Sequence, residues 1–178
     1  KGAASGLMMS KGSSLFRIFA KQNMSLSNII IKLNHEICES TSSGMFITMV
    51  IGCFDPQKKQ VRLINAGHEP VVFIDSNKQL HSYPANFRPV GIMPIDDEES
   101  IESTTIDAEE GKIFIYTDGV TEGYINANKE ELGTEGVEKI IKENYQSSLK
   151  DIIDIIVQTL SQADQDRRDD ITCLGIKL

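Results

Sequence analysis

The stretch Ile113-Phe114-Ile115-Tyr116-Thr117-Asp118-Gly119-Val120 decides the fold of this chain and indicates its chemistry. Its first five residues are apolar, aromatic or β-branched, which favours a buried strand. Asp118 and Gly119 follow at once, and an Asp-Gly pair after a strand is typical of a tight turn. We therefore expect one carboxylate at the end of a sheet, where it can bind a hard metal ion.

A second acidic pair, Asp169 and Asp170, stands directly before the last predicted strand, residues 171–177. Carboxylates without histidine or cysteine neighbours suit Mg²⁺ or Mn²⁺, and two such ions can activate a shared water for attack on phosphorus. Each motif also has a simpler interpretation. The first can be an ordinary strand-ending turn, and the second belongs to a charged run, residues 164–170, that solvent can accommodate.

The length and net charge of the chain limit the classes of protein to which it can belong. The chain has 178 residues and a formal net charge of −8, which predicts a single domain, residues 1–178, that can collect cations. An acidic balance argues against nucleic acid and against an anionic membrane surface as partners. No apolar run approaches the roughly 18 residues of a membrane span, so we expect no membrane segment here.

Cysteine usage points to the cytoplasm. Cys38, Cys53 and Cys173 are an odd number without CxxC spacing, and each lies in an apolar or helical stretch. We therefore expect reduced, buried thiols. A phosphatase with a cysteine nucleophile is excluded, because Lys59 stands where that chemistry needs an arginine after Cys53.

Hydrophobic periodicity predicts helices at both ends and strands between them. Residues 45–54 are apolar at nearly every position, which predicts a strand buried on both faces. Strands 61–65 and 71–75 are expected to form a hairpin, and strands 102–106 and 112–117 flank a turn, while 84–100 reads as a long loop. The expected helices are a stripe from Met8 to Phe19, a stripe from Leu26 to Ile37 capped by Ser25, residues 134–144, and residues 149–163 capped by Ser148 with Asp151 in the first turn.

The order helix, helix, block of strands, helix, helix, strand determines the predicted fold class. Strands that cluster rather than alternate with helices favour antiparallel sheets with helices outside them. We therefore predict an α+β fold, and not a doubly wound parallel sheet.

Six fragments in this order carry a family resemblance. They are Lys1-Gly2 before a helix, Met45-Phe46-Ile47-Thr48, Asn65-Ala66-Gly67-His68-Glu69-Pro70, Pro89-Val90-Gly91-Ile92, Tyr116 to Glu122, and Asp169-Asp170-Ile171-Thr172. With them the chain resembles the bacterial PPM-type serine/threonine phosphatases of the SpoIIE/RsbU kind. The resemblance runs over nearly the whole chain. It implies a β-sandwich of antiparallel sheets flanked by helix pairs, with metal ions at one sheet end.

The resemblance also implies residue roles. Asp118 and Asp169 are then metal ligands, Asp170 assists, Gly119 lets the chain turn beside the ion, and His68 lies near the site. The nucleophile would be a metal-bound water, with two Mn²⁺ or Mg²⁺ ions in the complete domain. Phosphoserine or phosphothreonine would be hydrolysed on a small phosphorylated STAS-domain (anti-anti-sigma) protein in a partner-switching pathway that regulates a sigma factor.

The resemblance places the start of the pattern outside this sequence. The family reads Asp-x-x-Gly-Lys-Gly, so its first metal-binding aspartate would precede Lys1. We therefore expect the C-terminal majority of a phosphatase domain, lacking its first strands and inactive as it stands if that segment is required. Members of the family are often the output end of a longer sensor chain, so the resemblance is compatible with an upstream sensory or receiver domain. A homodimer is also compatible with it, because open sheet edges invite association.

Two other functions remain open from the sequence. A pseudophosphatase would use the same fold to grip a partner without cleaving it, and an aspartate ahead of Lys1 would favour the enzyme instead. An unrelated two-metal hydrolase acting on nucleic acid is the third candidate, and the acidic balance argues against it.

Overall fold

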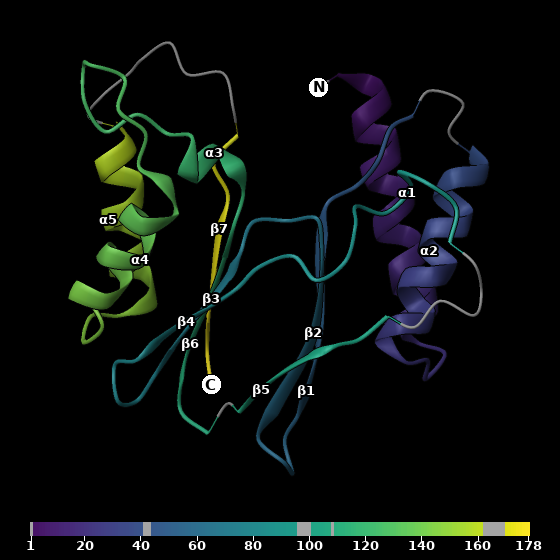
Figure 1. Ribbon diagram of the computed structural model, residues 1–178, viewed down its shortest axis with the longest axis horizontal. Coiled ribbons are helices and arrows are strands. Elements are labelled where there is room, and N and C mark those ends of the chain that lie inside the picture. The colour runs from purple at the N-terminus through teal and green to yellow at the C-terminus, as the bar shows by residue number, and fades with distance from the viewer. Residues whose placement is uncertain (1, 41–43, 96–100, 108, 162–169) are drawn as a thin grey trace. The chain divides into compact units, whose positions relative to one another are not determined.

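The computed structural model describes residues 2–40, 44–95, 101–107, 109–161 and 170–178 (Figure 1). The chain divides into two compact units, Lys1–His68 with Ala85–Asp107, and Glu69–Pro84 with Ala108–Leu178. Neither is one continuous segment, because the chain passes from one unit to the other three times.

The first unit begins with two helices, α1 (Ala3–Ala20) and α2 (Leu26–Ser40), which lie against each other (Figure 1). The hydroxyl of Ser25 accepts the backbone N–H of Asn28 at 3.2 Å, as the predicted N-cap requires. Both predicted apolar stripes are confirmed. Their side chains share one core, which includes Met8, Leu15, Phe16, Phe19, Ile29, Ile30, Leu33 and Ile37.

A three-stranded antiparallel sheet completes this unit, in the order β1 (Met49–Asp55), β2 (Gln60–Ala66), β5 (Thr104–Asp107). Successive side chains of a strand point to opposite faces. Ile64 and Ala66 therefore share one face of β2, and both belong to the core formed with α1 and α2.

The predicted strand over residues 45–54 is wrong in its start and in its burial. Strand β1 begins at Met49, and Ile47 forms only an isolated bridge with Val90. Ile51 is the single buried residue of β1, and Phe54 is 48% exposed. The reason is position: β1 is an edge strand, and an edge strand is covered less completely than a central one.

The second unit contains a four-stranded antiparallel sheet in the order β4 (Leu80–Tyr83), β3 (Val71–Asp75), β6 (Gly111–Tyr116), β7 (Cys173–Lys177). On β3 and β6, alternate residues pack against the helices of this unit. These residues are Val72, Ile74, Phe114 and Tyr116. Strand β6 is central, which explains why the stretch from Ile113 to Tyr116 is so apolar.

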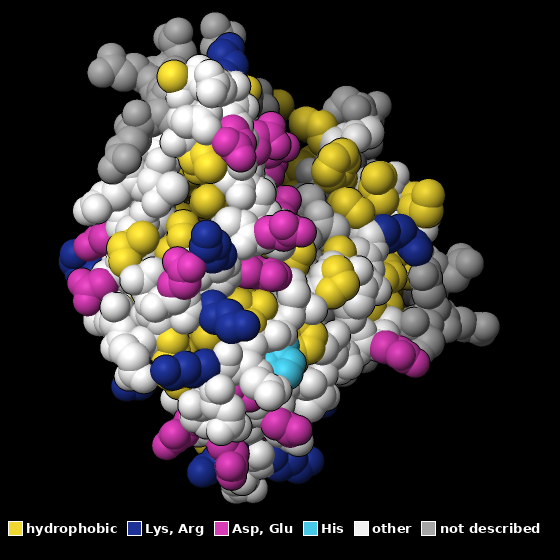
Figure 2. Space-filling view, turned by 60° about the vertical axis from the view of Figure 1, so that its left-hand side comes forward, with side chains coloured by type: hydrophobic (Ala, Val, Ile, Leu, Met, Phe, Trp, Pro, Cys, Tyr) yellow, Lys and Arg dark blue, Asp and Glu magenta, His cyan; other side chains and the backbone are white. Residues whose placement is uncertain are grey.

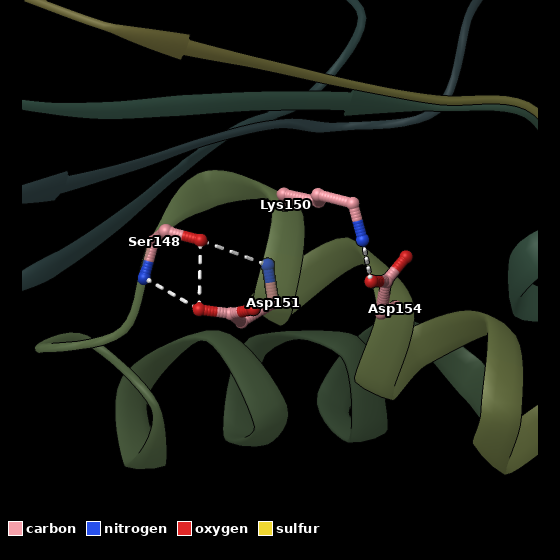
Figure 3. Close-up of polar contacts among 4 residues, drawn as sticks. All are labelled: Ser148, Lys150, Asp151 and Asp154. Carbon is pink, nitrogen blue, oxygen red and sulfur yellow. Dashed lines mark hydrogen bonds and ion pairs between the residues drawn. The ribbon is translucent and has the colours of Figure 1, made fainter.

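Helices α3 (Asp118–Thr121), α4 (Gly133–Glu143) and α5 (Leu149–Ser161) follow β6. Figure 3 shows the start of α5, where Ser148 and Asp151 form a reciprocal cap. The Ser148 hydroxyl accepts the Asp151 N–H at 3.1 Å, and the Asp151 carboxylate accepts the Ser148 N–H at 3.3 Å. The predicted cap is therefore confirmed, and an ion pair between Lys150 and Asp154 lies one turn further on.

The predicted hairpin between strands 61–65 and 71–75 is wrong. Strand β2 pairs with β1 and β5, whereas β3 pairs with β4 and β6 in the other sheet. The connection at Gly67 has its own partners: Gly67 has φ +66 and donates its N–H to Phe87 at 2.9 Å. The Gly67 backbone therefore contacts residues 86–89 and takes no part in a hairpin ladder.

Strands β5 and β6 flank the turn near Gly111 as expected, and they lie in different sheets. The acidic run at 96–99 within the predicted long loop lies outside the described residues. The prediction of buried thiols is wrong: Cys53 is exposed, because it lies on the edge strand β1, and Cys38 and Cys173 are only partly buried. All three thiols are free, as predicted. Among the described helices, none has both the length and the apolarity to cross a membrane.

A candidate metal site at the end of strand β6

Asp118 lies where the sequence predicts it, one residue after the extended Thr117 that follows β6. Its side chain is exposed, and its Oδ1 accepts the N–H of Gly119 at 2.8 Å. Its carbonyl oxygen accepts the hydroxyl of Thr121 at 3.1 Å and the N–H of Glu122 at 2.8 Å. The central strand and the one-turn helix α3 thus fix the backbone of a carboxylate that is open to solvent.

Residues 170–172 run directly beside this carboxylate. The N–H of Thr117 donates to the carbonyl of Thr172 at 3.0 Å, one step beyond the last ladder pair of β6 and β7. The carbonyl oxygen of Asp170 lies against Gly119, closer to the position of a Cβ atom there than van der Waals radii permit. The structure therefore brings the Asp118-Gly119 motif and Asp170 together, although the two motifs are distant in sequence.

Asp169 lies outside the described residues, so its predicted role as a metal ligand stays a prediction. The side chain of Asp170 is exposed. Within the described part of the chain, no group of three or more histidine, cysteine, aspartate or glutamate side chains is arranged to hold a metal ion. The roles of Asp170 and Gly119 at an ion also stay predictions.

Glu69 and Glu122 add negative charge near Asp118. Partial burial raises the pKa of Glu69, and the charges of Asp118 and Glu122 raise it further. Acidic side chains form a group near the upper middle of the face drawn in Figure 2. Negative charge near Asp118 lowers the electrostatic cost of bringing a cation there, because a cation offsets carboxylates that otherwise repel each other, although the described carboxylates alone are not arranged as a metal-binding group.

The sequence interpretation missed Glu69 and Glu122 as neighbours of Asp118. Both stand in fragments that were singled out, at the end of Asn65 to Pro70 and of Tyr116 to Glu122. Their acidic character was the available signal. The proximity of Glu69 to Asp118 was not, because it depends on the pairing of β3 with β6, whereas Glu122 lies only four residues after Asp118 and bonds to its carbonyl.

His68 belongs to the first unit, whereas Asp118 belongs to the second. The His68 Nδ1 lies 3.2 Å from the hydroxyl of Thr48, and its N–H donates to Asn65 Oδ1 at 2.9 Å. Asn65 is fully buried and is tied to Asn86 through its own N–H at 2.8 Å. The imidazole is therefore held in place, and its predicted role near the metal stays a prediction.

Comparison with solved structures defines the class of protein. The SiaA-PP2C domain of Pseudomonas aeruginosa matches with a TM-score of 0.83 and 15% identity, over 99% of this chain and 71% of that one. The fold is therefore that of a PP2C-type (PPM) phosphatase domain, and the predicted class, α+β with antiparallel sheets and helix pairs, is confirmed.

The family model for Stage II sporulation protein E (SpoIIE) matches residues 1–178, and this chain belongs to that family. Among curated proteins, Protein IcfG of Synechocystis is 28% identical over 90% of this chain and 29% of its own length. Phosphoserine phosphatase RsbU of Bacillus subtilis is 25% identical over 99% of this chain and 52% of its own length. The predicted resemblance is confirmed, and the chain spans about half or less of these two relatives.

Proposed function

We propose that this chain belongs to a protein serine/threonine phosphatase that depends on Mn²⁺ or Mg²⁺. The proposal rests above all on the contact between Gly119 and the carbonyl of Asp170. Because of this contact, the Asp118-Gly119 motif and Asp170 lie next to each other at the end of the central strand β6. Membership of the SpoIIE family supports the phosphatase class.

The chemistry of the donors fits a hard divalent cation. Asp118 and Glu122, whose charges raise the pKa of Glu69, are both carboxylates. Oxygen donors of this kind suit Mg²⁺ and Mn²⁺. Gly119 allows the backbone of Asp170 to approach, which a larger residue would prevent. We assign Asp118 and Asp169 as ligands, with Asp170 assisting, in a site that holds two ions in the complete domain. Ions held there would activate water for attack on phosphorus.

The residues of this chain contribute order and charge. The Gly119 N–H restrains the Asp118 carboxylate at 2.8 Å, so less conformational entropy is lost when it takes up an ion. Glu69 and Glu122 increase the local negative potential, which attracts a cation and disfavours an unscreened anion. A cation bound there would offset the repulsion between these carboxylates and the phosphate group of a substrate.

The substrate class follows from similarity to a relative named a phosphoserine phosphatase. We infer hydrolysis of phosphoserine or phosphothreonine on a phosphorylated STAS-domain protein in a cytoplasmic partner-switching pathway, under an upstream regulatory domain. We also infer that His68 contributes near the site. The net charge of −8 argues against nucleic acid as the substrate.

The test compares two carboxylate-to-amide variants in the full-length protein. Asp118→Asn should reduce Mn²⁺-dependent hydrolysis of a phosphoserine protein more than about 100-fold, because it removes a ligand charge. Asp154→Asn is the matched control, since the Asp154 side chain on α5 is 46% exposed and pairs with Lys150 among the described residues. Undiminished turnover by Asp118→Asn would overturn the assignment. Tight binding of the phosphoprotein by the wild type without hydrolysis would instead support a pseudophosphatase.

A further inference from the structure

The hydroxyl of Thr117 joins the Asp118 motif to the segment that follows Asp169. It donates to the carbonyl oxygen of Asp170 at 3.1 Å and accepts the N–H of Thr172 at 3.1 Å. Together with the backbone bond from Thr117 N–H to the Thr172 carbonyl, three hydrogen bonds hold residues 170–172 against one residue. We call this group of bonds the Thr117 clasp.

The clasp lies beyond the end of the regular sheet. The last ladder pair of β6 and β7 is Tyr116 with Cys173, so the sheet itself does not hold Asp170. A hydroxyl can donate and accept at the same time, and serine and threonine are the small side chains with this property. The Thr117 side chain therefore extends the pairing of the two segments where the backbone ladder stops.

Gly119 meets the same carbonyl from another direction. The oxygen of Asp170 accepts the Thr117 hydroxyl and also occupies the space that a side chain on residue 119 would need. One carbonyl is thus fixed by a hydrogen bond on one side and by close backbone contact on the other. The two residues that flank Asp118 both determine where Asp170 lies.

We propose that Thr117 is a positioning residue for the metal site, an inference that rests on the function proposed above. Through the clasp it holds the backbone of residues 170–172 in register with the Asp118 motif. Residues that orient metal ligands without touching the ion typically change metal affinity about 10–100-fold when they are lost. The clasp explains how acidic residues from distant parts of the sequence keep a fixed spacing before an ion arrives.

A purely structural role is the competing explanation, and it predicts a different pattern. Asp170, Ile171 and Thr172 are exposed, so water can replace the lost hydrogen bonds when the hydroxyl is removed. Global stability should therefore change little. If the clasp orders the site, metal affinity should fall far more than stability does.

The experiment uses the full-length protein and three variants. Thr117→Val removes the hydroxyl at nearly constant volume, and Thr117→Ser keeps it. Thr159→Val removes a hydroxyl on helix α5 that donates to the Ile155 carbonyl at 2.8 Å. Mn²⁺ affinity is measured by isothermal titration calorimetry, and the free energy of unfolding by urea denaturation without metal. Thr117→Val should raise the Kd for Mn²⁺ roughly tenfold, Thr117→Ser should restore it, and Thr159→Val should leave it unchanged.

Each outcome supports or overturns a defined statement. Wild-type Mn²⁺ affinity in Thr117→Val, or the same loss in Thr117→Ser, would overturn the positioning role and leave the proposed function intact. A wild-type protein that binds no Mn²⁺ would overturn both. If Thr117→Val does not fold, Thr117→Ala serves in its place, and the serine variant still tests whether the hydroxyl is what matters.

Discussion

The carbonyl oxygen of Asp170 occupies the space that a side chain at Gly119 would fill. This contact is between two backbones, so neither partner can turn away as a flexible side chain would. It makes the identity of residue 119 a condition for the neighbouring acidic segment to lie where it does.

Gly119→Ala should therefore separate the two acidic motifs. The added methyl group must displace the Asp170 carbonyl, which should cost about 1–3 kcal/mol of stability and raise the Kd for Mn²⁺ more than about tenfold. Gly6→Ala is the matched control, because nothing lies within 4 Å of a Cβ at Gly6 in α1. That change should raise stability by about 0.5–1 kcal/mol without altering metal affinity. Unchanged Mn²⁺ binding in Gly119→Ala, measured by calorimetry, would show that the carbonyl can move without consequence.

Asn34 should be among the most sensitive polar residues of the first unit. It is fully buried, accepts the N–H of Gly91 at 2.7 Å and donates to the carbonyl of Met93 at 2.9 Å. Asn34→Leu leaves both backbone groups without this partner, so we expect a loss of about 2–4 kcal/mol in the free energy of unfolding. Asn28→Leu, at an exposed position of the same helix, should change it by less than about 0.5 kcal/mol. If urea denaturation gives the same change for Asn34→Leu and Asn28→Leu, the buried hydrogen bonds of Asn34 make no net contribution to the free energy of unfolding.

The cap of α5 offers a local test of stability. Ser148→Ala removes the hydroxyl that accepts the Asp151 N–H (Figure 3), and we expect a loss of about 1 kcal/mol. Lys150→Ala removes only an exposed ion pair with Asp154, which should matter by less than about 0.5 kcal/mol. Thermal and urea denaturation measure both variants. A larger loss in Lys150→Ala than in Ser148→Ala would contradict this ranking.

The cysteines should differ in reactivity and in their effect on alkaline stability. Partial burial raises the pKa of the Cys173 thiol to about 11, whereas Cys53 is exposed. Mass spectrometry should therefore find that iodoacetamide modifies Cys53 well before Cys173 at pH 8.5. The same pKa fixes the sign of the stability change. The unfolded thiol ionises first, so the stabilisation from the buried thiol is complete below pH 9 and is lost as pH rises through 11.

Cys173→Ser is the control for that pH dependence, because serine does not ionise in this range. The wild type should lose more of its unfolding free energy than Cys173→Ser between pH 8.5 and pH 11. If both proteins lose the same amount of unfolding free energy, ionisable groups other than Cys173 cause the loss of stability at alkaline pH.

The sequence was most informative where structure depends on nearby residues. The stripe from Leu26 to Ile37 and the cap at Ser148 follow from helical spacing and local hydrogen bonds, and both are confirmed. The hairpin around Gly67 was wrong, because a turn signal does not reveal which strands pair. The exposure of Phe54 could not be foreseen either, since an apolar run looks the same at the edge and at the centre of a sheet.

The candidate site divides in the same way. The position of Asp118 at a strand end could be predicted from the residues around it, because strand and turn are both local signals. Glu69 lies near Asp118 because of strand pairing, which the sequence does not reveal. The contact of Gly119 with Asp170 likewise depends on the path of the chain into β7. The two hydrogen bonds of the Thr117 hydroxyl leave no mark in the sequence beyond the presence of a threonine.

The interleaving of the two units along the chain limits how the protein can be cut. Strand β2 pairs with β5 and strand β3 with β6, so any break between residues 84 and 104 separates both pairs at once. A chain that ends or begins in that interval lacks one strand of each pair, so both sheets lose a partner strand. Versions of this protein cut in that interval should therefore lose both sheets together, whereas a chain that ends after Asp107 keeps every residue of the first unit.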